Sequence, residues 1–374
     1  MVISGLAISG VRNLSDAEYQ FGSATNVVVG PNGAGKTSLL ESVVILGNIR
    51  SFRALSVRQV VAHGRPGFRV SGLISTGGRQ YCLEQVVEHG PPLGRTLRVD
   101  GKTVSVERYL QLCPVFAIAG SDRELIVGGP ESRRRFLDRF VFLQRPNHLT
   151  EIRSYRRALR QRNAALVSGA TTAEVEAWEG PLAKSAARVI GARVDAQITL
   201  SDLFQQVWRE LSAEASPAIT LEYRAEPWNE PIEGRETVEV LYRQRYNETR
   251  TRDRQMGFTV DGPHRHDLSL KADGRSVRYE LSSGQIKVVA AALKLAALML
   301  VERDRNESFP VVVDDVDAEL DSAALKRLAH SLGSERQLFL SSTSEEVLDL
   351  VGPRGCSIWL ENGSSVVQGA STDD

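Results

Sequence analysis

The sequence lacks the features that mark disulfide-bonded, secreted and membrane-spanning proteins. Its three cysteines, Cys82, Cys113 and Cys356, lie far apart without metal-ligand spacing, so a reduced cytoplasmic setting is expected rather than a disulfide framework. No basic segment followed by an apolar core opens the sequence, so no signal peptide is expected. The longest apolar run, Val288–Val301, contains Lys294 and is shorter than the roughly 20 residues of a membrane span. This run predicts a buried helix, and no membrane association is expected.

Excess charge of one sign is also absent, and aromatic residues are few. The 46 Lys and Arg balance the 46 Asp and Glu, so any nucleic-acid binding must come from a local basic patch. Aromatic residues make up only 6% and do not interleave with the arginines, which favours contacts with a nucleic-acid backbone over base stacking. The 374 residues are enough for two or three domains, or for one large head with an insertion.

A complete phosphate-binding loop lies near the start of the sequence. Residues Gly30–Thr37 fit the Gly-x4-Gly-Lys-Ser/Thr pattern, between a short β-branched run at Asn26–Val29 and a helical pattern over Ser38–Leu46. In such a loop Lys36 reaches the β- and γ-phosphates, the Thr37 hydroxyl ligates Mg²⁺, and backbone N–H groups surround the phosphates. The residues expected to contact the nucleotide here are Gly30, Pro31, Asn32, Gly33, Ala34, Gly35, Lys36, Thr37 and Ser38.

Two acids follow a second apolar strand, Val311–Val313. A carboxylate at the end of a buried strand can hold Mg²⁺, so Asp314 is assigned to the metal. Asp315 would orient or deprotonate the attacking water, because phosphoryl transfer needs little beyond positioning and charge neutralisation. The alternative interpretation is an acid pair that caps the next helix.

The pentapeptide Leu281–Gln285, Leu-Ser-Ser-Gly-Gln, precedes a helix that starts near Ile286. Ser282, with the amides of Ser283 and Gly284, would form an anion site at the helix N-terminus, and Gln285 completes the group. The alternative is a plain N-cap by Ser282 or Ser283. The pentapeptide lies one helix before Asp314 and downstream of the phosphate loop. This order predicts ATP bound between two copies of the chain, with Ser282 of one copy touching the γ-phosphate held by the other.

The remaining patterns predict a head with an insertion. Runs at Phe68–Ile74, Tyr81–Val87, Thr96–Val99 and Thr103–Val106 indicate a β-meander, with Asp100-Gly101 as a hairpin turn. Segments 131–167, 173–214 and 235–256 indicate helices, and Ala218–Tyr223 a short strand. A further strand is expected at Gln337–Leu340. The tail 362–374, rich in Ser, Gly and Asp, is expected to fray.

The order of these motifs resembles the ABC-type ATPases, and within their SMC-like DNA-repair branch it resembles the RecF family of bacterial recombination mediators. The collinear pieces that carry the resemblance are Asn32–Thr37 with Leu40-Glu41, Ser51–Arg53, Gly128–Pro130, Arg133–Asp138, Gln161–Leu166, Gly262–Leu268 and Glu319–Asp321. SMC proteins insert hundreds of coiled-coil residues between the halves of their head, whereas this chain has room only for a short lobe without sustained heptads.

The resemblance implies an α/β fold: an ABC-type ATPase head with a mixed sheet and a β-meander, carrying an inserted, mainly helical second lobe and no long coiled coil. The expected parts are residues 1–128 and 299–374 for the ATPase lobe, and residues 129–298, including the pentapeptide, for the helical lobe. Relatives contact the nucleotide at the position of Arg12-Asn13. Glu319–Asp321 corresponds to the D-loop, and Ser341–Thr343 to the switch position.

The same resemblance implies an ATP-dependent homodimer that binds double-stranded, gapped or junction DNA and has a weak ATPase activity, which DNA stimulates. Members of the family help to load RecA, acting with RecO and RecR. The alternatives are an ATPase subunit of a transporter, and an ATP-binding module without hydrolysis.

Two details depart from these patterns or leave a role open. The family's usual Pro-Glu-Asp-Leu segment is replaced here by Gly120–Arg123, which keeps only Asp122, so the role of Asp122 near the nucleotide is open. His264 and His266 could suggest a metal, but without further ligands nearby a hydrogen-bonded structural pair is expected.

Three arginine clusters could contact DNA phosphates without reading bases. The alternative for each is a solvated helix face with ion pairs to neighbouring acids. The third cluster spans Arg243 to Arg254. The residues proposed from the first two clusters are Arg133, Arg134, Arg135, Arg153, Arg157 and Arg160.

Overall fold

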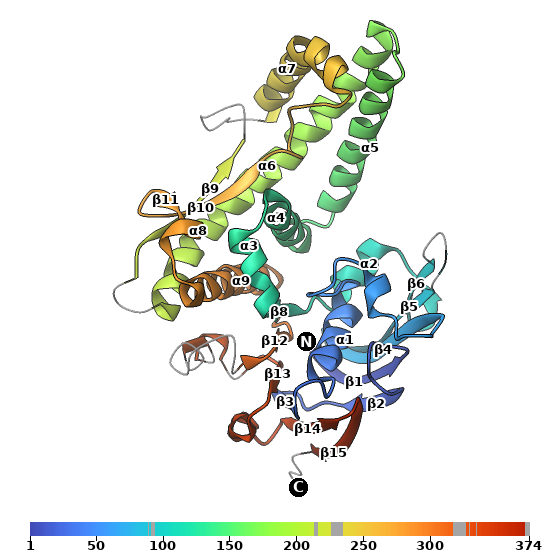
Figure 1. The fold of residues 1–374 in the computed structure, drawn as a ribbon, viewed down its shortest axis with the longest axis vertical. Coiled ribbons are helices and arrows are strands. Elements are labelled where there is room, and N and C mark those ends of the chain that lie inside the picture. Colours follow the sequence, from blue (N-terminus) through green and yellow to red (C-terminus); the bar gives the residue numbers. More distant parts are fainter. Residues whose placement is uncertain are drawn as a thin grey trace. The chain divides into compact units, whose positions relative to one another are not determined.

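The chain divides into two compact units, which are described separately (Figure 1). The computed structural model describes residues 1–88, 90, 94–212, 216–225, 235–316, 327–328, 330–333 and 335–370. Unit 1 comprises Met1–Arg123, Val207–Glu214 and Ser282–Asp374, and unit 2 comprises Glu124–Gln206 and Ala215–Leu281. The expected D-loop, Glu319–Asp321, lies outside the described residues.

The units differ from the expected lobes at one boundary. The division between Arg123 and Glu124 lies close to the expected boundary after residue 128. The expected boundary after residue 298, in contrast, is replaced by a division between Leu281 and Ser282. The reason is that helix α9 (Ser283–Arg305), which follows Ser282, packs against strand β8 and turn η2 of unit 1. The end of helix α6, from Val207, also belongs to unit 1.

A mostly parallel sheet carries the acidic strand and the strand before the phosphate loop. Its order is β15-β14-β3-β13-β12-β8. All neighbouring pairs are parallel except β14 and β15, so the carboxyl ends of β3, β13, β12 and β8 meet at one edge. The bounds are β3 Thr25–Val29, β8 Phe116–Ile118, β12 Val311–Val313, β13 Leu338–Ser342, β14 Cys356–Glu361 and β15 Ser364–Ala370. Because β15 pairs with β14, the prediction that the tail frays is wrong for residues 364–370.

A second sheet of unit 1 is antiparallel, with the order β2-β1-β4-β5-β6-β7. Its strands are β1 Val2–Ser9, β2 Ala17–Gln20, β4 Gly67–Thr76, β5 Arg79–Glu88, β6 Gly94–Val99 and β7 Lys102–Thr103. The β-meander prediction is therefore confirmed, and Asp100 and Gly101 both have the positive φ angles that a tight hairpin turn requires. The last predicted strand is too long, since Ser105 caps helix α2 (Val106–Leu112).

Helix α1 (Lys36–Asn48) lies between the two sheets of unit 1 and contacts strands of both (Figure 1). Twelve of its 13 residues are buried, the polar Lys36, Glu41 and Asn48 among them, so the helix is covered nearly all round rather than on one face. Helix α9 is long and apolar enough to cross a membrane, and 67% of its most apolar stretch is buried within the described part of the protein. That burial agrees with the core helix predicted from Val288–Val301.

Unit 2 consists of helices and a small sheet. The helices are α3 (Arg123–Val127, beginning at the unit boundary), α4 (Pro130–Gln144), α5 (His148–Val167), α6 (Thr172–Leu211), α7 (Arg235–Met256) and α8 (Val277–Glu280). The sheet, of order β11-β10-β9, contains β9 (Ile219–Arg224), β10 (Asp267–Ala272) and β11 (Arg275–Ser276). The predicted segment 131–167 is two helices, because Pro146 interrupts the helical hydrogen bonds between α4 and α5.

Candidate nucleotide-binding site

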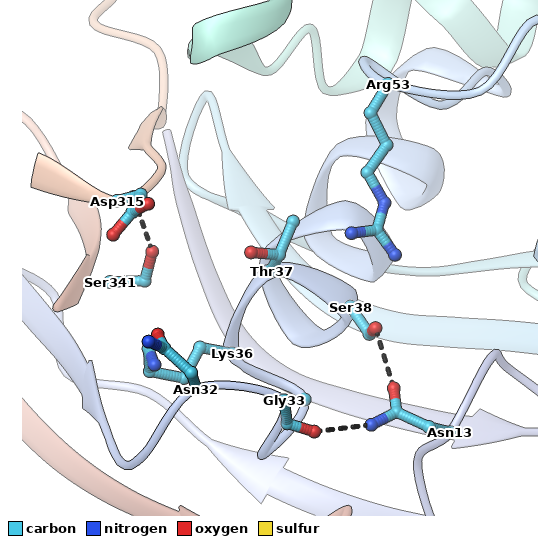
Figure 2. Close-up of a pocket in the computed structure, with 10 residues that line it drawn as sticks. Asn13, Asn32, Gly33, Lys36, Thr37, Ser38, Arg53, Asp315 and Ser341 are labelled. Atoms are coloured by element: carbon cyan, nitrogen blue, oxygen red, sulfur yellow. Dashed lines mark hydrogen bonds between the residues drawn. The ribbon is translucent and has the colours of Figure 1, made fainter. Parts of the chain in front are cut away.

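The phosphate loop joins the end of β3 to the start of α1 and lines a cavity of about 300 Å³ (Figure 2). Gly35 is the residue before α1 and has a φ angle of 107°, which an L side chain rarely adopts. A Cβ at Gly30 would lie 2.2 Å from the carbonyl oxygen of Leu360, so the loop can also approach β14 only with glycine there. Asn32, Gly33, Gly35, Lys36, Thr37 and Ser38 line the cavity.

Lys36 closes over the loop that carries it. Its Nζ donates to the carbonyl oxygens of Gly30 at 2.7 Å and Pro31 at 3.0 Å, and the residue is buried. The ammonium therefore stays inside the loop, within reach of phosphates that the backbone N–H groups and the start of α1 would bind.

The two residues assigned to Mg²⁺ from the sequence contact each other. Thr37 and Asp314 share a side-chain hydrogen bond, and the Ser341 hydroxyl donates to Asp314 Oδ1 at 2.8 Å. Burial raises the pKa of Asp314, although the hydrogen bonds from Ser341 and Thr37 lower it in part. A cation here would favour the charged carboxylate. A hydroxyl beside a buried carboxylate suits a hard cation such as Mg²⁺, so the donor set fits the expected metal.

Asp315 lies on the wall of the same cavity, opposite the start of α1 (Figure 2). Its backbone N–H donates to Ser341 Oγ at 2.8 Å, and its φ angle is 53°, in the left-handed region. Ser341, at the expected switch position, thus contacts both acids at once.

Asn13 and Arg12, both expected at the nucleotide, occupy different places. Asn13 lines the cavity, donates to the Gly33 carbonyl at 3.0 Å and accepts from the Ser38 hydroxyl at 3.0 Å. Arg12 is instead bound in a bidentate ion pair to Glu41, with both N···O distances at 2.9 Å.

Arg53 lines the cavity but was not predicted as a site residue (Figure 2). Its Nε lies 3.3 Å from Glu41, a fully buried acid of α1 that also binds Arg12 and accepts from the Ser51 hydroxyl. The resemblance of Ser51–Arg53 to the family was the one sequence signal that could have identified Arg53 as a cavity residue. The spacing between Arg53 and the phosphate loop gives no such indication.

The pentapeptide begins α9 with a capping box. Gln285 N–H donates to Ser282 Oγ at 3.2 Å, and Ser282 N–H donates to Gln285 Oε1 at 2.9 Å. The N-cap interpretation is thus realised, and it does not exclude phosphate binding, because the Ser282 hydroxyl can still donate its proton. Ser282, Ser283 and Gly284 are exposed and do not line the cavity of their own chain.

The two histidines singled out in the sequence, His264 and His266, have structural partners in unit 2. His264 contacts the Tyr155 hydroxyl and the Thr259 carbonyl, and His266 lies between the hydroxyls of Tyr223 and Tyr242. No group of three or more His, Cys, Asp or Glu side chains that could hold a metal occurs among the residues that the structure describes. The three cysteines are free thiols.

The assignment of Arg133 to DNA is corrected by the structure. This arginine is buried, and its guanidinium binds both oxygens of Asp267 at 2.8 Å, so it cannot face a phosphate backbone. Arg134 donates to the His266 carbonyl, and Arg135 is paired with Glu131. In contrast, Arg153, Arg157 and Arg160 lie on the exposed side of α5.

The parallel sheet, the phosphate loop, the paired acids and the capped pentapeptide helix define an ABC-type ATPase head. Residues 2–354 match the RecF/RecN/SMC N terminal domain family. The chain is 33% identical to the DNA replication and repair protein RecF of Anaeromyxobacter sp. (strain Fw109-5), over 97% of this chain and 98% of that protein. It is 31% identical to the protein of that name from Yersinia pseudotuberculosis serotype O:1b (strain IP 31758), over 98% and 99%.

The fold resembles the solved structure of the recombination mediator protein RecF with ATP in the RecFOR pathway. The TM-score is 0.89 at 23% identity, covering 99% of this chain and 98% of that one. The chain therefore belongs to the RecF family, and its head has the ATP-binding fold of that family. This membership does not favour the alternative of a transporter subunit.

Proposed function

We propose that this protein is an ATP-dependent, DNA-binding dimerisation switch that acts in recombinational repair. The observation that carries the proposal is the split of the expected ATP ligands into two sets. Lys36, Thr37, Asp314 and Asp315 gather at one cavity, whereas Ser282 caps a helix outside that cavity. A complete site then requires the cavity of one copy and the pentapeptide of a second.

In this proposal the phosphate loop and Lys36 bind the phosphates, while Thr37 and Asp314 hold Mg²⁺, which neutralises charge on the β- and γ-phosphates. Asp315 orients the attacking water. Ser282 and the exposed amides of Ser283 and Gly284 stabilise the γ-phosphate held by the partner copy. The association energy appears only with ATP, so dimerisation is linked to ligand binding. Aspartate is shorter than the glutamate usual in this class, which accounts for a weak ATPase.

The DNA-binding part of the proposal rests on helix α5. Between Ile152 and Ser168 the chain contains no acidic residue, and the apolar side of α5 is buried. Arg156, Arg157 and Arg160 are exposed and have no ion pair or hydrogen bond among the described residues, and Arg153 extends the same exposed row. Such a row suits the backbone of double-stranded, gapped or junction DNA.

The relatives support the wider role. The RecF structures resembled here come from the RecFOR pathway, and the curated relatives are DNA replication and repair proteins. We therefore place this chain with RecO and RecR in the loading of RecA, as a switch whose dimer forms on DNA and reopens after hydrolysis.

The test is light scattering of the purified protein with and without ATP and Mg²⁺. We expect the wild-type chain and Asp315→Asn to form dimers with ATP, and the Asp315→Asn dimer to persist because hydrolysis is slowed. Lys36→Met removes a charged hydrogen-bond donor and should weaken ATP binding roughly 10- to 100-fold. Ser282→Arg should leave ATP binding by the monomer unchanged and prevent dimerisation.

Three outcomes would contradict parts of the proposal. An Asp315→Asn protein that stays monomeric with saturating ATP would exclude the switch. Equal loss of ATP binding in Lys36→Met and Ser282→Arg would place Ser282 at the nucleotide of its own chain and exclude the shared site. A hydrolysis rate that DNA does not change would exclude the DNA-stimulated ATPase.

A further inference from the structure

The hairpin turns Asp100-Gly101, Asp273-Gly274 and Asn362-Gly363 share one backbone geometry but not one environment. In each turn both residues have positive φ angles, between 48° and 83°, as type I′ turns require. A Cβ at Gly101 or Gly274 would meet no atom of the described residues within 4 Å. A Cβ at Gly363 would instead overlap the carbonyl oxygen of Asn13. The turn between β14 and β15 is therefore packed against the rest of unit 1, whereas the other two turns face open space.

The packed turn binds the phosphate loop directly. The backbone N–H of Gly363 donates to the carbonyl oxygen of Ala34 at 3.0 Å. The carbonyl oxygen of Gly363 accepts the backbone N–H of Ser15 at 2.8 Å, and the hydroxyls of Ser15 and Ser364 are 2.8 Å apart. Gly363 thus joins the phosphate loop to the segment that begins at Asn13, which lines the nucleotide cavity.

The bond to Gly363 orients a hydrogen-bond donor of the cavity. In a trans peptide the C=O and the following N–H point in opposite directions. Because the Ala34 carbonyl points toward Gly363, the N–H of Gly35 points away from the hairpin, and Gly35 lines the cavity. The preceding carbonyl, of Gly33, is held by Asn13 Nδ2 at 3.0 Å (Figure 2). The shape that lets backbone N–H groups bind phosphate is therefore fixed from outside the loop.

Strand β14 supports the other end of the loop. Gly30, the first residue of the loop, lies so close to the carbonyl oxygen of Leu360 that a Cβ there would overlap it. Leu360 belongs to β14, which pairs with β3 on one side and with β15 on the other. The hairpin is thus anchored in the parallel sheet, and it contacts the phosphate loop at its first residue and again at Ala34.

We propose that the hairpin of β14 and β15 is a positioning element of the nucleotide site, with Gly363 and Ser15 as its positioning residues. Neither residue lines the cavity, so both act through the shape of the phosphate loop. This inference rests on the proposed ATP site and extends it to the last hairpin of the chain. Since coupling between two sites is reciprocal, ATP must also stabilise the contacts of the hairpin.

The first experiment compares Gly363→Ala with Gly101→Ala in the full chain carrying Ser282→Arg, which keeps the protein monomeric with ATP. Both substitutions place a Cβ at a positive φ angle of a type I′ turn, so both should lower the melting temperature. Only Gly363→Ala also displaces the phosphate loop. We expect its affinity for a fluorescent ATP analogue to fall about tenfold, while Gly101→Ala binds the analogue as its parent does.

The second experiment needs no substitution in the hairpin. Hydrogen exchange of the same Ser282→Arg chain is measured with and without saturating ATP and Mg²⁺. The amides of Gly363 and Ser15 should exchange at least about fivefold more slowly with ATP, because binding stabilises the contacts that they make. The control is the amide of Asp100, which donates to the Cys82 carbonyl at 2.9 Å in the matched turn and should not change.

The outcomes separate this inference from the proposed function. Equal ATP affinity of Gly363→Ala and Gly101→Ala would overturn the positioning role, and so would an exchange rate at Gly363 that saturating ATP leaves unchanged. A parent chain that binds no ATP would instead overturn the proposed function.

Discussion

Glu41 illustrates a residue whose role depends on partners that are distant in the sequence. It is fully buried on α1, yet it binds Arg12 and Arg53, which come from segments before and after the phosphate loop. Each buried carboxylate of this kind is tolerated only because guanidinium groups compensate its charge. Glu41 does not line the nucleotide cavity itself, but it holds Arg53, which does.

His264 gives a prediction at the residue scale. Burial is the largest cause that lowers the pKa of His264 to about 4, from 6.5, so the folded protein keeps this imidazole neutral. The resulting stability is present above pH 6.5 and is lost as the pH falls towards 4. Between pH 7 and pH 5 we expect this residue alone to remove about 2 kcal/mol from the free energy of unfolding.

Urea unfolding at the two pH values measures this loss. The matched variant is His264→Gln, in which the difference between pH 7 and pH 5 should shrink by a similar amount, since glutamine cannot titrate. An identical pH dependence in the variant and the wild-type chain would show that His264 binds its proton equally well in the folded and unfolded states, which would contradict the lowered pKa.

Sequence reasoning succeeded at residues whose spacing fixes local geometry. The phosphate loop could be assigned because a strand, glycines and a helix start follow one another within a dozen residues. Thr37 and Asp314 were each assigned to Mg²⁺ from a different motif, and in the structure their side chains lie together. The contacts of Arg53 with Glu41, of Arg133 with Asp267 and of Asp122 with Lys294 could not be predicted, because each depends on how distant segments fold back.

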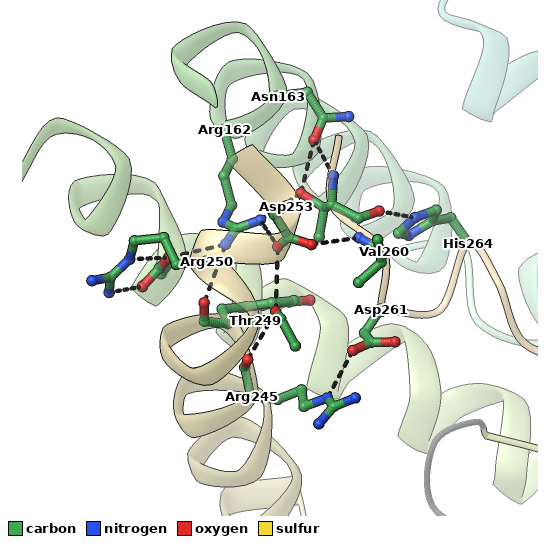
Figure 3. Close-up of polar contacts among 12 residues, drawn as sticks. Arg162, Asn163, Arg245, Thr249, Arg250, Asp253, Val260, Asp261 and His264 are labelled. Atoms are coloured by element: carbon green, nitrogen blue, oxygen red, sulfur yellow. Dashed lines mark hydrogen bonds and ion pairs between the residues drawn. The ribbon is translucent and has the colours of Figure 1, made fainter. Parts of the chain in front are cut away.

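At the scale of elements, the helices of unit 2 are joined by a buried ionic network (Figure 3). Arg162 of α5 is fully buried and binds Asp253 at 2.6 Å, Thr259 at 2.8 Å and Glu179 at 3.1 Å. Asn163 accepts from the backbone and hydroxyl of Thr259, whose carbonyl contacts His264. The two family-like pieces Gln161–Leu166 and Gly262–Leu268 thus meet in one network.

Arg162→Met should destabilise unit 2 strongly, because it leaves the buried Asp253 without its cation. We expect a loss of about 3–5 kcal/mol in the free energy of unfolding, measured by denaturant titration. ATP binding should be unchanged, since every residue that lines the nucleotide cavity belongs to unit 1.

Arg250→Met is the control for this network. Arg250 also binds Glu179 but is 14% exposed, so its removal should cost less, about 1 kcal/mol. Equal losses for the two variants would mean that the burial of Arg162 does not determine the stability of unit 2.

The elements themselves were predictable where a period of two or of 3.6 residues extends over a whole strand or helix. The β-meander and α1 follow such patterns, whereas α9 was predicted from the apolar run Val288–Val301 and α7 from a composition with few turn residues. The break between α4 and α5 required attention to one proline. Strand β15 was missed because its Ser- and Gly-rich sequence gains its order from pairing with β14.

At the scale of the whole molecule, the net charge of zero gives no indication of DNA binding, whereas the distribution of the charges does. The acid-free run along α5 gives one exposed face a positive charge that the neutral total conceals. We expect the triple variant Arg156→Gln, Arg157→Gln, Arg160→Gln to weaken duplex binding for all sequences equally. The slope of log K against log salt should decrease by roughly 0.9 for each DNA phosphate that the variant no longer neutralises.

Fluorescence anisotropy with labelled duplex at several salt concentrations measures that slope. Arg135→Gln is the control, because this exposed arginine is already paired with Glu131. An unchanged slope in the triple variant, with an unchanged melting temperature, would exclude α5 as the DNA-binding surface.

The strand order of the parallel sheet has a consequence for biosynthesis. Strand β3, which leads into the phosphate loop, lies between β13 and β14, and Thr25 is paired with Leu338. A ribosome therefore completes most of the chain before β3 can acquire its neighbours, and the apolar strand Thr25–Val29 remains unpaired for most of translation. The segments of unit 2 leave the ribosome before β13 and β14, so unit 2 can fold before the parallel sheet is complete. During translation, aggregation is therefore most expected at the unpaired strand that leads into the phosphate loop.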